Sequence, residues 1–150
     1  RTRKMGDDIG VVMDIGSFKS KVGIIGEDYP RAIFPSVVGK PKGKQARGVQ
    51  IDTYVGDEAE GIFGSSILTR PIEDRYIENW DYVERIWNHS IFNEIRFTPE
   101  DGYVIIIDSP LNTRENRERI VKIMLEKFNF SSCFILNSST ASLFASGRTG

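Results

Sequence analysis

The segment Met13–Gly23 constrains the fold most, because it joins two strand-like runs through a turn of small residues. An apolar run, Ile9–Met13, leads into the turn at Gly16-Ser17, and a second run, Val22–Ile25, leaves it. Short apolar runs separated by turn residues are typical of paired strands. The segment therefore predicts two antiparallel strands joined by a tight turn.

The residue types in this turn suit a phosphate group. A turn of small residues lets backbone N–H groups point at anionic oxygens, and the hydroxyl of Ser17 adds a donor. Lys21 can neutralise phosphate charge, and Asp14 can hold a hydrated Mg²⁺. Taken alone, the pattern Asp-x-Gly-Ser is a weak signal and favours an ordinary hairpin with a surface lysine.

Composition indicates one globular domain and excludes several kinds of site. The 150 residues are 39% hydrophobic and 27% charged, with a net charge of −1, so nucleic acid and membrane surfaces are not expected partners. One cysteine, Cys133, and one histidine, His89, exclude an internal disulfide and argue against a histidine metal site or triad. The longest aliphatic run, Val104–Ile107, is too short for a bilayer, and Arg1–Met5 gives no sign of a signal peptide.

Residues 31–96 predict a strand, an inserted lobe and a helix. Arg31–Phe34 is a third strand, and residues 36–70, rich in glycine with a basic cluster at 40–47, predict an inserted lobe of short strands. Trp80, Val83, Trp87 and Ile91 recur at helical spacing. A helix capped by Asn79 is therefore expected to end near Arg96, with both tryptophans in the core.

The remaining elements alternate between strand and helix. Tyr103–Ile107 predicts a buried strand, and Asn112 with Glu115 resembles a helix cap for a helix that ends near Phe128. Cys133–Leu136 predicts a fifth strand, and Ser138–Ala145 a last helix.

This order predicts an α/β fold with one mixed five-stranded sheet, because right-handed crossovers place the last two strands parallel to the first. Ligands of open α/β sheets lie beyond the carboxyl ends of the strands. Asp14, Asp108 and Ser138 all fall at such ends, which strengthens the phosphate interpretation.

Several segments spread over nearly the whole chain match one family: Pro30–Ser36, Tyr54–Ala59, Pro71–Glu73, Asn79–Asp81, Pro110–Asn112, Asn116–Glu118 and Ala145–Thr149. In these segments the chain resembles actin and the actin-related proteins. The resemblance implies a ribonuclease-H-like core at 1–35 plus 71–150, an inserted lobe at 36–70, and ATP with Mg²⁺ or Ca²⁺ bound between two such halves, of which this chain covers the first.

Within that resemblance, four residues match the family's nucleotide site. Asp14 falls on the carboxylate that orders the waters of the cation, Gly16 and Ser17 fall in the first phosphate loop, and Lys21 falls on the phosphate-contacting lysine. Phe18, in the same loop, is the fifth residue expected at the nucleotide site. It stands where actin has a glycine, and a ring there is expected to crowd the approach of phosphate.

Two further departures bear on activity. Ser138 occupies the position of the glutamine that orients the attacking water, so slow or absent hydrolysis is expected and no catalytic residue is assigned. The loop Lys42–Ile51 is two residues shorter than the family's DNase-binding loop and has a basic rather than apolar tip, which should weaken self-assembly.

The first hypothesis is an ATP-binding actin-like protein with a cytoskeletal or assembly role in the cytoplasm. The alternative is a non-catalytic actin-related scaffold subunit of a chromatin-remodelling or dynactin-type complex, which leaves a nuclear location open. In both cases ATP and other protein subunits are the expected partners. A sugar-kinase or chaperone-type ATPase half is disfavoured by the actin-specific segments.

Overall fold

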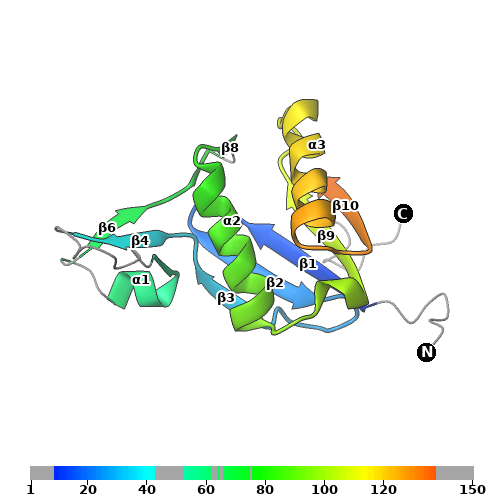
Figure 1. The fold of residues 1–150 in the computed structure, drawn as a ribbon, viewed down its shortest axis with the longest axis horizontal. Helices are drawn as coiled ribbons and strands as arrows, with labels where there is room; N and C mark the ends of the chain where they lie inside the picture. The colour runs from blue at the N-terminus through cyan, green and yellow to red at the C-terminus, as the bar shows by residue number, and fades with distance from the viewer. Residues whose placement is uncertain (1–8, 43–52, 62–63, 65, 75, 138–150) are drawn as a thin grey trace.

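The protein is built on a five-stranded mixed sheet, seen in a computed structural model that describes residues 9–42, 53–61, 64, 66–74 and 76–137 (Figure 1). The strand order is β10-β9-β1-β2-β3. The bounds are β1 Ile9–Ile15, β2 Lys19–Ile24, β3 Ala32–Pro35, β9 Gly102–Asp108 and β10 Ser132–Asn137. The predicted fold class is confirmed.

Strand directions also follow the prediction. β1 pairs antiparallel with β2, with Val11 opposite Ile24 and Ile15 opposite Ser20. β9 pairs parallel with β1 on one side and with β10 on the other. The carboxyl ends of β1, β9 and β10 therefore point to one edge of the sheet.

The first long helix, α2, spans Trp80–Asn88 and begins as predicted, since the Asn79 side chain accepts a hydrogen bond from the Tyr82 amide at 3.1 Å. It continues as a π-helical segment, η1, over His89–Glu94. The Ser90 hydroxyl donates to the Ile86 carbonyl at 2.7 Å, and such back-bonding disturbs regular helical pairing. Arg96 follows the end of the helix with a left-handed φ of 51°, close to the expected stop.

The second long helix, α3, spans Arg114–Lys122 and continues as η3 over Ile123–Lys127. The predicted cap was wrong by one residue: Thr113, not Asn112, accepts from the Asn116 amide at 3.2 Å. The Asn112 side chain is engaged elsewhere, because its amide nitrogen donates to Asp108.

The core lies between the sheet and these two helices, which cover the same face of the sheet (Figure 1). The sheet contributes alternate residues whose side chains are almost fully buried, and the helices contribute a matching apolar stripe. Trp87 is 2% exposed, which confirms its core assignment, whereas Trp80 is only half-buried and packs under the Arg119 guanidinium at 4.2 Å. The members of the core include Val11, Met13, Val22, Val104, Ile106, Val83, Ile86, Trp87, Ile120 and Met124.

A second, three-stranded sheet, named here the small sheet, lies between β3 and α2 in the chain, with order β5-β4-β6. Its strands are β4 Val38–Pro41, β5 Tyr54–Val55 and β6 Ser66–Thr69, with helix α1 Asp57–Gly61 beside them. A hairpin of β7 Ile72–Glu73 and β8 Tyr76–Ile77 then leads to α2, and a 3₁₀ turn, η2 Pro99–Asp101, precedes β9. Helix α1 and the hairpin were not predicted from the sequence, and the division of the chain at 36–70 stays a prediction.

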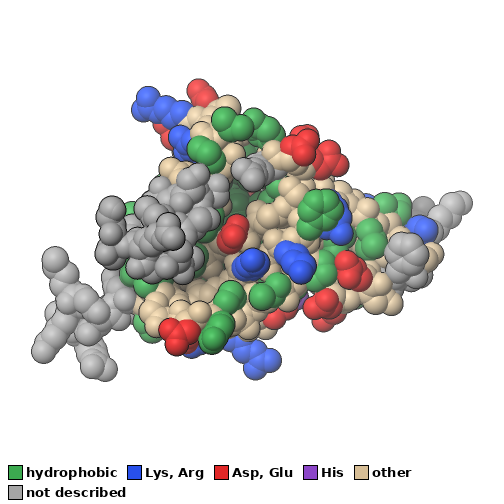
Figure 2. Space-filling view, turned by 180° about the vertical axis from the view of Figure 1, so that it is seen from behind, with side chains coloured by type: hydrophobic (Ala, Val, Ile, Leu, Met, Phe, Trp, Pro, Cys, Tyr) green, Lys and Arg blue, Asp and Glu red, His purple; other side chains and the backbone are tan. Residues whose placement is uncertain are grey.

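The view from behind shows acidic and basic side chains interspersed with hydrophobic ones over the described part of that face (Figure 2). No helix among the described residues is long and apolar enough to cross a membrane. The predicted helix Ser138–Ala145, and most of the basic cluster at 40–47, lie outside the described residues.

The close approach of Gly102 in β9 to the Ile9 backbone in β1 gives a test of the sheet. A Cβ there would overlap the Ile9 carbonyl oxygen and lie 2.8 Å from the Phe97 ring. We expect Gly102→Ala to lower the free energy of unfolding by about 3 kcal/mol, the upper range for overpacking, because backbone cannot move aside cheaply.

Urea denaturation measures this change, and Gly61→Ala is the matched control because a Cβ at Gly61 meets nothing within 4 Å. Equal midpoints for the two variants would contradict the close pairing of β9 with β1.

Candidate functional site

A cavity of about 290 Å³ lies at the carboxyl ends of β1 and β9. Its polar lining comes from the turn after β1 and from the end of β9, and its walls are aliphatic and aromatic. The polar residues are Asp14, Gly16, Ser17, Asp108 and Ser109, and the walls include Ile72, Ile77, Val83, Trp87, Ile106 and Ile120. The sheet therefore brings together two carboxylates that are 94 positions apart in the chain.

The turn between β1 and β2 is narrow and tied at its base. The Gly16 amide donates to the Lys19 carbonyl at 2.9 Å, and a Cβ at Gly16 would lie 3.0 Å from that same oxygen. On the far side the Ser36 amide donates to the Phe18 carbonyl at 2.9 Å, and the hydroxyls of Ser20 and Ser36 hydrogen-bond at 2.7 Å in the buried interior. The backbone of the turn is therefore held from two directions.

Asp14 combines a crowded carboxyl group with a neighbouring cation. The residue retains exposed surface, but burial by surrounding protein raises the pKa of its carboxyl group, and the charge of Lys21 lowers it by a smaller amount. Asp14 and Lys21 are directly opposite in the β1–β2 register, which places both side chains on the same face of the sheet. Lys21 itself does not line the cavity.

Phe18 lies outside the cavity. Its side chain is 70% exposed, and the Arg70 guanidinium carbon lies 4.9 Å from the centre of its ring. Of the five residues predicted for the nucleotide site, Asp14, Gly16 and Ser17 line the cavity, whereas Phe18 and Lys21 flank it. Ser138 lies outside the described residues.

Asp108 is the carboxylate that sequence reasoning placed at a strand end without assigning it to the site. Its two oxygens accept from the Asn112 amide group at 3.0 and 3.1 Å, and the Arg117 guanidinium lies 3.4 Å away. Asn112 in turn accepts from the Asn116 side chain at 3.0 Å. This network fixes Asp108 in place at the cavity, and its signal in the sequence was the spacing Asp108-x₃-Asn112-x₃-Asn116.

The histidine and the cysteine take no part in this site. His89 packs edge-on against Phe34, with ring centres 5.1 Å apart, and pairs with Glu94 at 2.9 Å. Burial raises the pKa of the Cys133 thiol to about 12, so the thiol stays protonated and is a poor nucleophile at neutral pH. Neither residue lines the smaller cavity.

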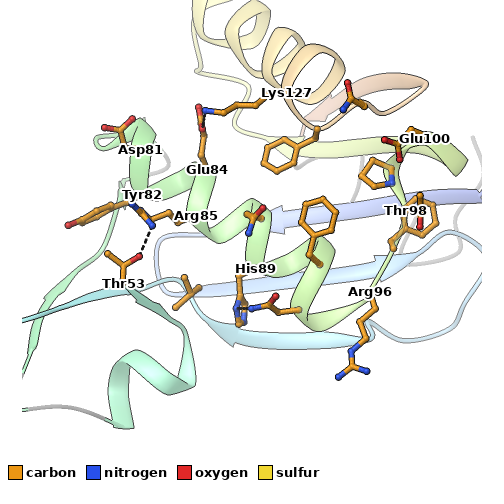
Figure 3. A pocket seen from close by; sticks show the side chains of 18 of the residues that line it. Thr53, Asp81, Tyr82, Glu84, Arg85, His89, Arg96, Thr98, Glu100 and Lys127 are labelled. Atoms are coloured by element: carbon orange, nitrogen blue, oxygen red, sulfur yellow. Dashed lines mark hydrogen bonds and ion pairs between the residues drawn. The ribbon is translucent and has the colours of Figure 1, made fainter. Parts of the chain in front are cut away.

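A larger groove of about 1070 Å³ lies elsewhere, along α2, η1 and the end of η3 (Figure 3). Its charged side chains are of both signs, and three of them have partners within the groove: Lys127 binds Glu84, and Arg85 donates to Thr53 at 2.8 Å. It shares no lining residue with the smaller cavity. The smaller cavity is the better candidate site, because it combines a turn of small residues with the strand-end carboxylates.

Comparison with known families decides the identity of the fold. The family model for actin matches residues 6–150. The chain belongs to the actin family. The mixed five-stranded sheet is that of an actin-like half-domain, and the cavity lies at the turn that the resemblance placed in the family's first phosphate loop.

The donor set of this actin-family chain suits a hydrated divalent cation next to phosphate. Mg²⁺ keeps several waters and is bound through one or two carboxylates plus substrate oxygens, and Asp14 and Asp108 line the same cavity. The described residues contain no group of three or more His, Cys, Asp or Glu side chains that could hold an ion by themselves. The residues present therefore fit a hydrated divalent cation whose remaining ligands are waters and phosphate oxygens.

The raised pKa of Asp14 predicts a pH-dependent effect on stability. Below the unfolded-state pKa the carboxyl group is neutral in both states, whereas above its raised folded-state pKa the folded protein carries a charge that burial disfavours. Asp14→Asn should therefore gain free energy of unfolding relative to the original protein as pH rises through this window, and the gain should then level off.

Denaturant titrations of both proteins across this pH range measure the effect. In a protein that already carries Lys21→Met, the stability gained by Asp14→Asn should be larger. The positive charge that offsets the burial of the Asp14 carboxylate is then missing. If the free energy of unfolding of Asp14→Asn, relative to that of the original protein, fell as pH rises, burial would not be the cause of the raised pKa of Asp14.

Proposed function

We propose that this actin-family chain binds the phosphate tail of ATP, together with a divalent cation, as one half of a two-lobed nucleotide cleft. The observation that carries the proposal is the shared lining of one cavity by Asp14 from the end of β1, by Gly16 and Ser17 from the β1–β2 turn, and by Asp108 from β9. These groups meet where open α/β sheets bind their ligands.

Each residue has a separate task in this proposal. The narrow turn at Gly16 and Ser17 offers backbone and hydroxyl donors to phosphate oxygens. Lys21, beside Asp14 on β2, offsets the negative charge of the phosphates. Asp14 orients waters of the cation, and the bound cation would neutralise charge on the phosphate oxygens.

The size of the cavity supports a nucleotide site that is shared between this half and a second lobe. Pockets that enclose a drug-sized ligand have volumes of roughly 300–1,000 Å³. At about 290 Å³ the cavity accommodates a polyphosphate tail better than a whole nucleotide. The base and ribose would then contact a second lobe, as the family resemblance implies.

The resemblance also supports a role in assembly with other protein subunits, cytoskeletal and cytoplasmic in the first instance. Ser138 in place of the water-orienting glutamine supports slow hydrolysis, since a serine side chain is too short to position the same water. This departure also favours the second candidate, a non-catalytic actin-related scaffold subunit in the cytoplasm or nucleus.

Titration of Mg·ATP into the full-length protein by calorimetry tests the binding proposal. Asp14→Ala should weaken binding at least tenfold, because the cation loses the carboxylate that orients its waters, and a tenfold loss corresponds to about 1.4 kcal/mol. Asp28→Ala, which removes an exposed carboxylate in the β2–β3 connection, is the control and should bind as the original protein does. The absence of binding at millimolar nucleotide, or equal losses in the two variants, would overturn the proposal.

A second experiment tests slow hydrolysis. Ser138→Gln should raise the rate of phosphate release at saturating Mg·ATP by about tenfold or more, because the longer side chain can orient the attacking water. Ser138→Ala removes the hydroxyl without adding an amide and should stay slow. A glutamine variant no faster than the alanine variant would show that this position does not limit the reaction.

A further inference from the structure

Arg70 contacts the outer side of the candidate phosphate turn at three points. One guanidinium nitrogen, Nη1, donates to the carbonyls of Ser17 and Phe18, each at 3.3 Å. The guanidinium also lies over the Phe18 ring, 4.9 Å from its centre. An arginine that stacks on an aromatic face while donating in its own plane is held in both position and orientation.

Arg70 is not part of the core sheet. It directly follows β6 of the small sheet and precedes Pro71, so it lies on the segment by which the chain returns from the small sheet. Ser36 lies on the outgoing segment, between β3 and β4, and its amide donates to the same Phe18 carbonyl at 2.9 Å. Both connections between the two sheets therefore meet at one oxygen of the turn.

The direction of these hydrogen bonds matters for the turn. In a planar trans peptide the carbonyl of one residue and the N–H of the next point in opposite directions, and the described residues contain no cis peptide. When Arg70 captures the carbonyls of Ser17 and Phe18, the amides of Phe18 and Lys19 must point away from Arg70. The guanidinium therefore sets the direction in which the turn presents its N–H groups.

We propose that Arg70 is a positioning residue that fixes the phosphate turn from the small sheet, with the Phe18 ring as its platform; this rests on the proposed function. The clasp formed by Arg70 and Phe18 orients the turn for phosphate and couples it to the position of the small sheet. Phe18 thus has a use that a glycine could not supply, since glycine offers no surface for the guanidinium.

Hydrogen exchange of the nucleotide-free, full-length protein tests the clasp without reference to ATP. Arg70→Gln and Phe18→Leu should each raise exchange in the peptide spanning 15–20 about fivefold or more, whereas Phe18→Tyr keeps the aromatic face and should exchange as the original protein does. The α3 peptide 114–122 should be unchanged, which separates loss of the clasp from global unfolding. Because Phe18 is 70% exposed, the leucine variant should fold even where the Arg70 variant does not.

Exchange in 15–20 that is unchanged in the leucine variant would overturn the proposal. An increase shared equally by 114–122 would do the same, since it would show a general loss of stability in place of a local one.

Titration of Mg·ATP tests the positioning role. Arg70→Gln and Phe18→Leu should each weaken binding about fivefold, and the double variant should be no weaker than Arg70→Gln alone, because the two side chains act as a unit. Phe18→Tyr keeps the aromatic ring and should bind Mg·ATP as tightly as the original protein does. Arg31→Gln is the control for loss of one positive charge, since Arg31 is exposed and pairs with Glu27 away from the turn.

Equal affinity of Arg70→Gln and Arg31→Gln would overturn the positioning role. If the original protein binds no nucleotide, the proposed function fails, and the exchange measurement alone then supports or refutes the clasp.

Discussion

The pairing of β1 with strands of both directions is the constraint on which the rest of the structure depends. β1 joins β2 antiparallel through a short turn and β9 in parallel through a long connection, so it belongs at once to a hairpin and to an α/β sheet. The hairpin places a turn of small residues beside Asp14, and the parallel pairing brings the end of β9, with Asp108, to the same edge. Neither pairing alone would form the cavity, and the burial of Val11 and Met13 under α2 and α3 keeps both in register.

The turn itself is short, and its shape depends on groups outside the hairpin. Gly16 allows the close return to Lys19, while Ser36 and Arg70 hold the Phe18 carbonyl from the two segments that lead to and from the small sheet. This arrangement ties the turn to both connections that lead to the small sheet. It also explains how a large aromatic side chain is accommodated at Phe18, since the ring lies at the surface and supports Arg70.

The sequence predicted the sheet well because its signals are local. Apolar runs such as Ile9–Met13 and the helical spacing of Trp80, Val83 and Trp87 report burial directly, and the order of elements then limits the topology. The cap at Thr113 was missed because Asn112, an equally good capping residue, is drawn to Asp108 by a tertiary contact. Arg70 could not be found, because no local pattern indicates that an arginine 52 positions away will stack on Phe18. The site residues on the turn were predicted from residue type, whereas the contacts that orient them depend on distant segments.

The most direct test of the account is a crystal structure of the full-length protein with Mg²⁺ and a non-hydrolysable ATP analogue. The account predicts phosphate oxygens within hydrogen-bond distance of the backbone amides of Phe18 and Lys19 in the turn, with a water of the cation bound to Asp14. Phosphates bound in the larger groove along α2, with the turn making no contact to the ligand, would contradict it.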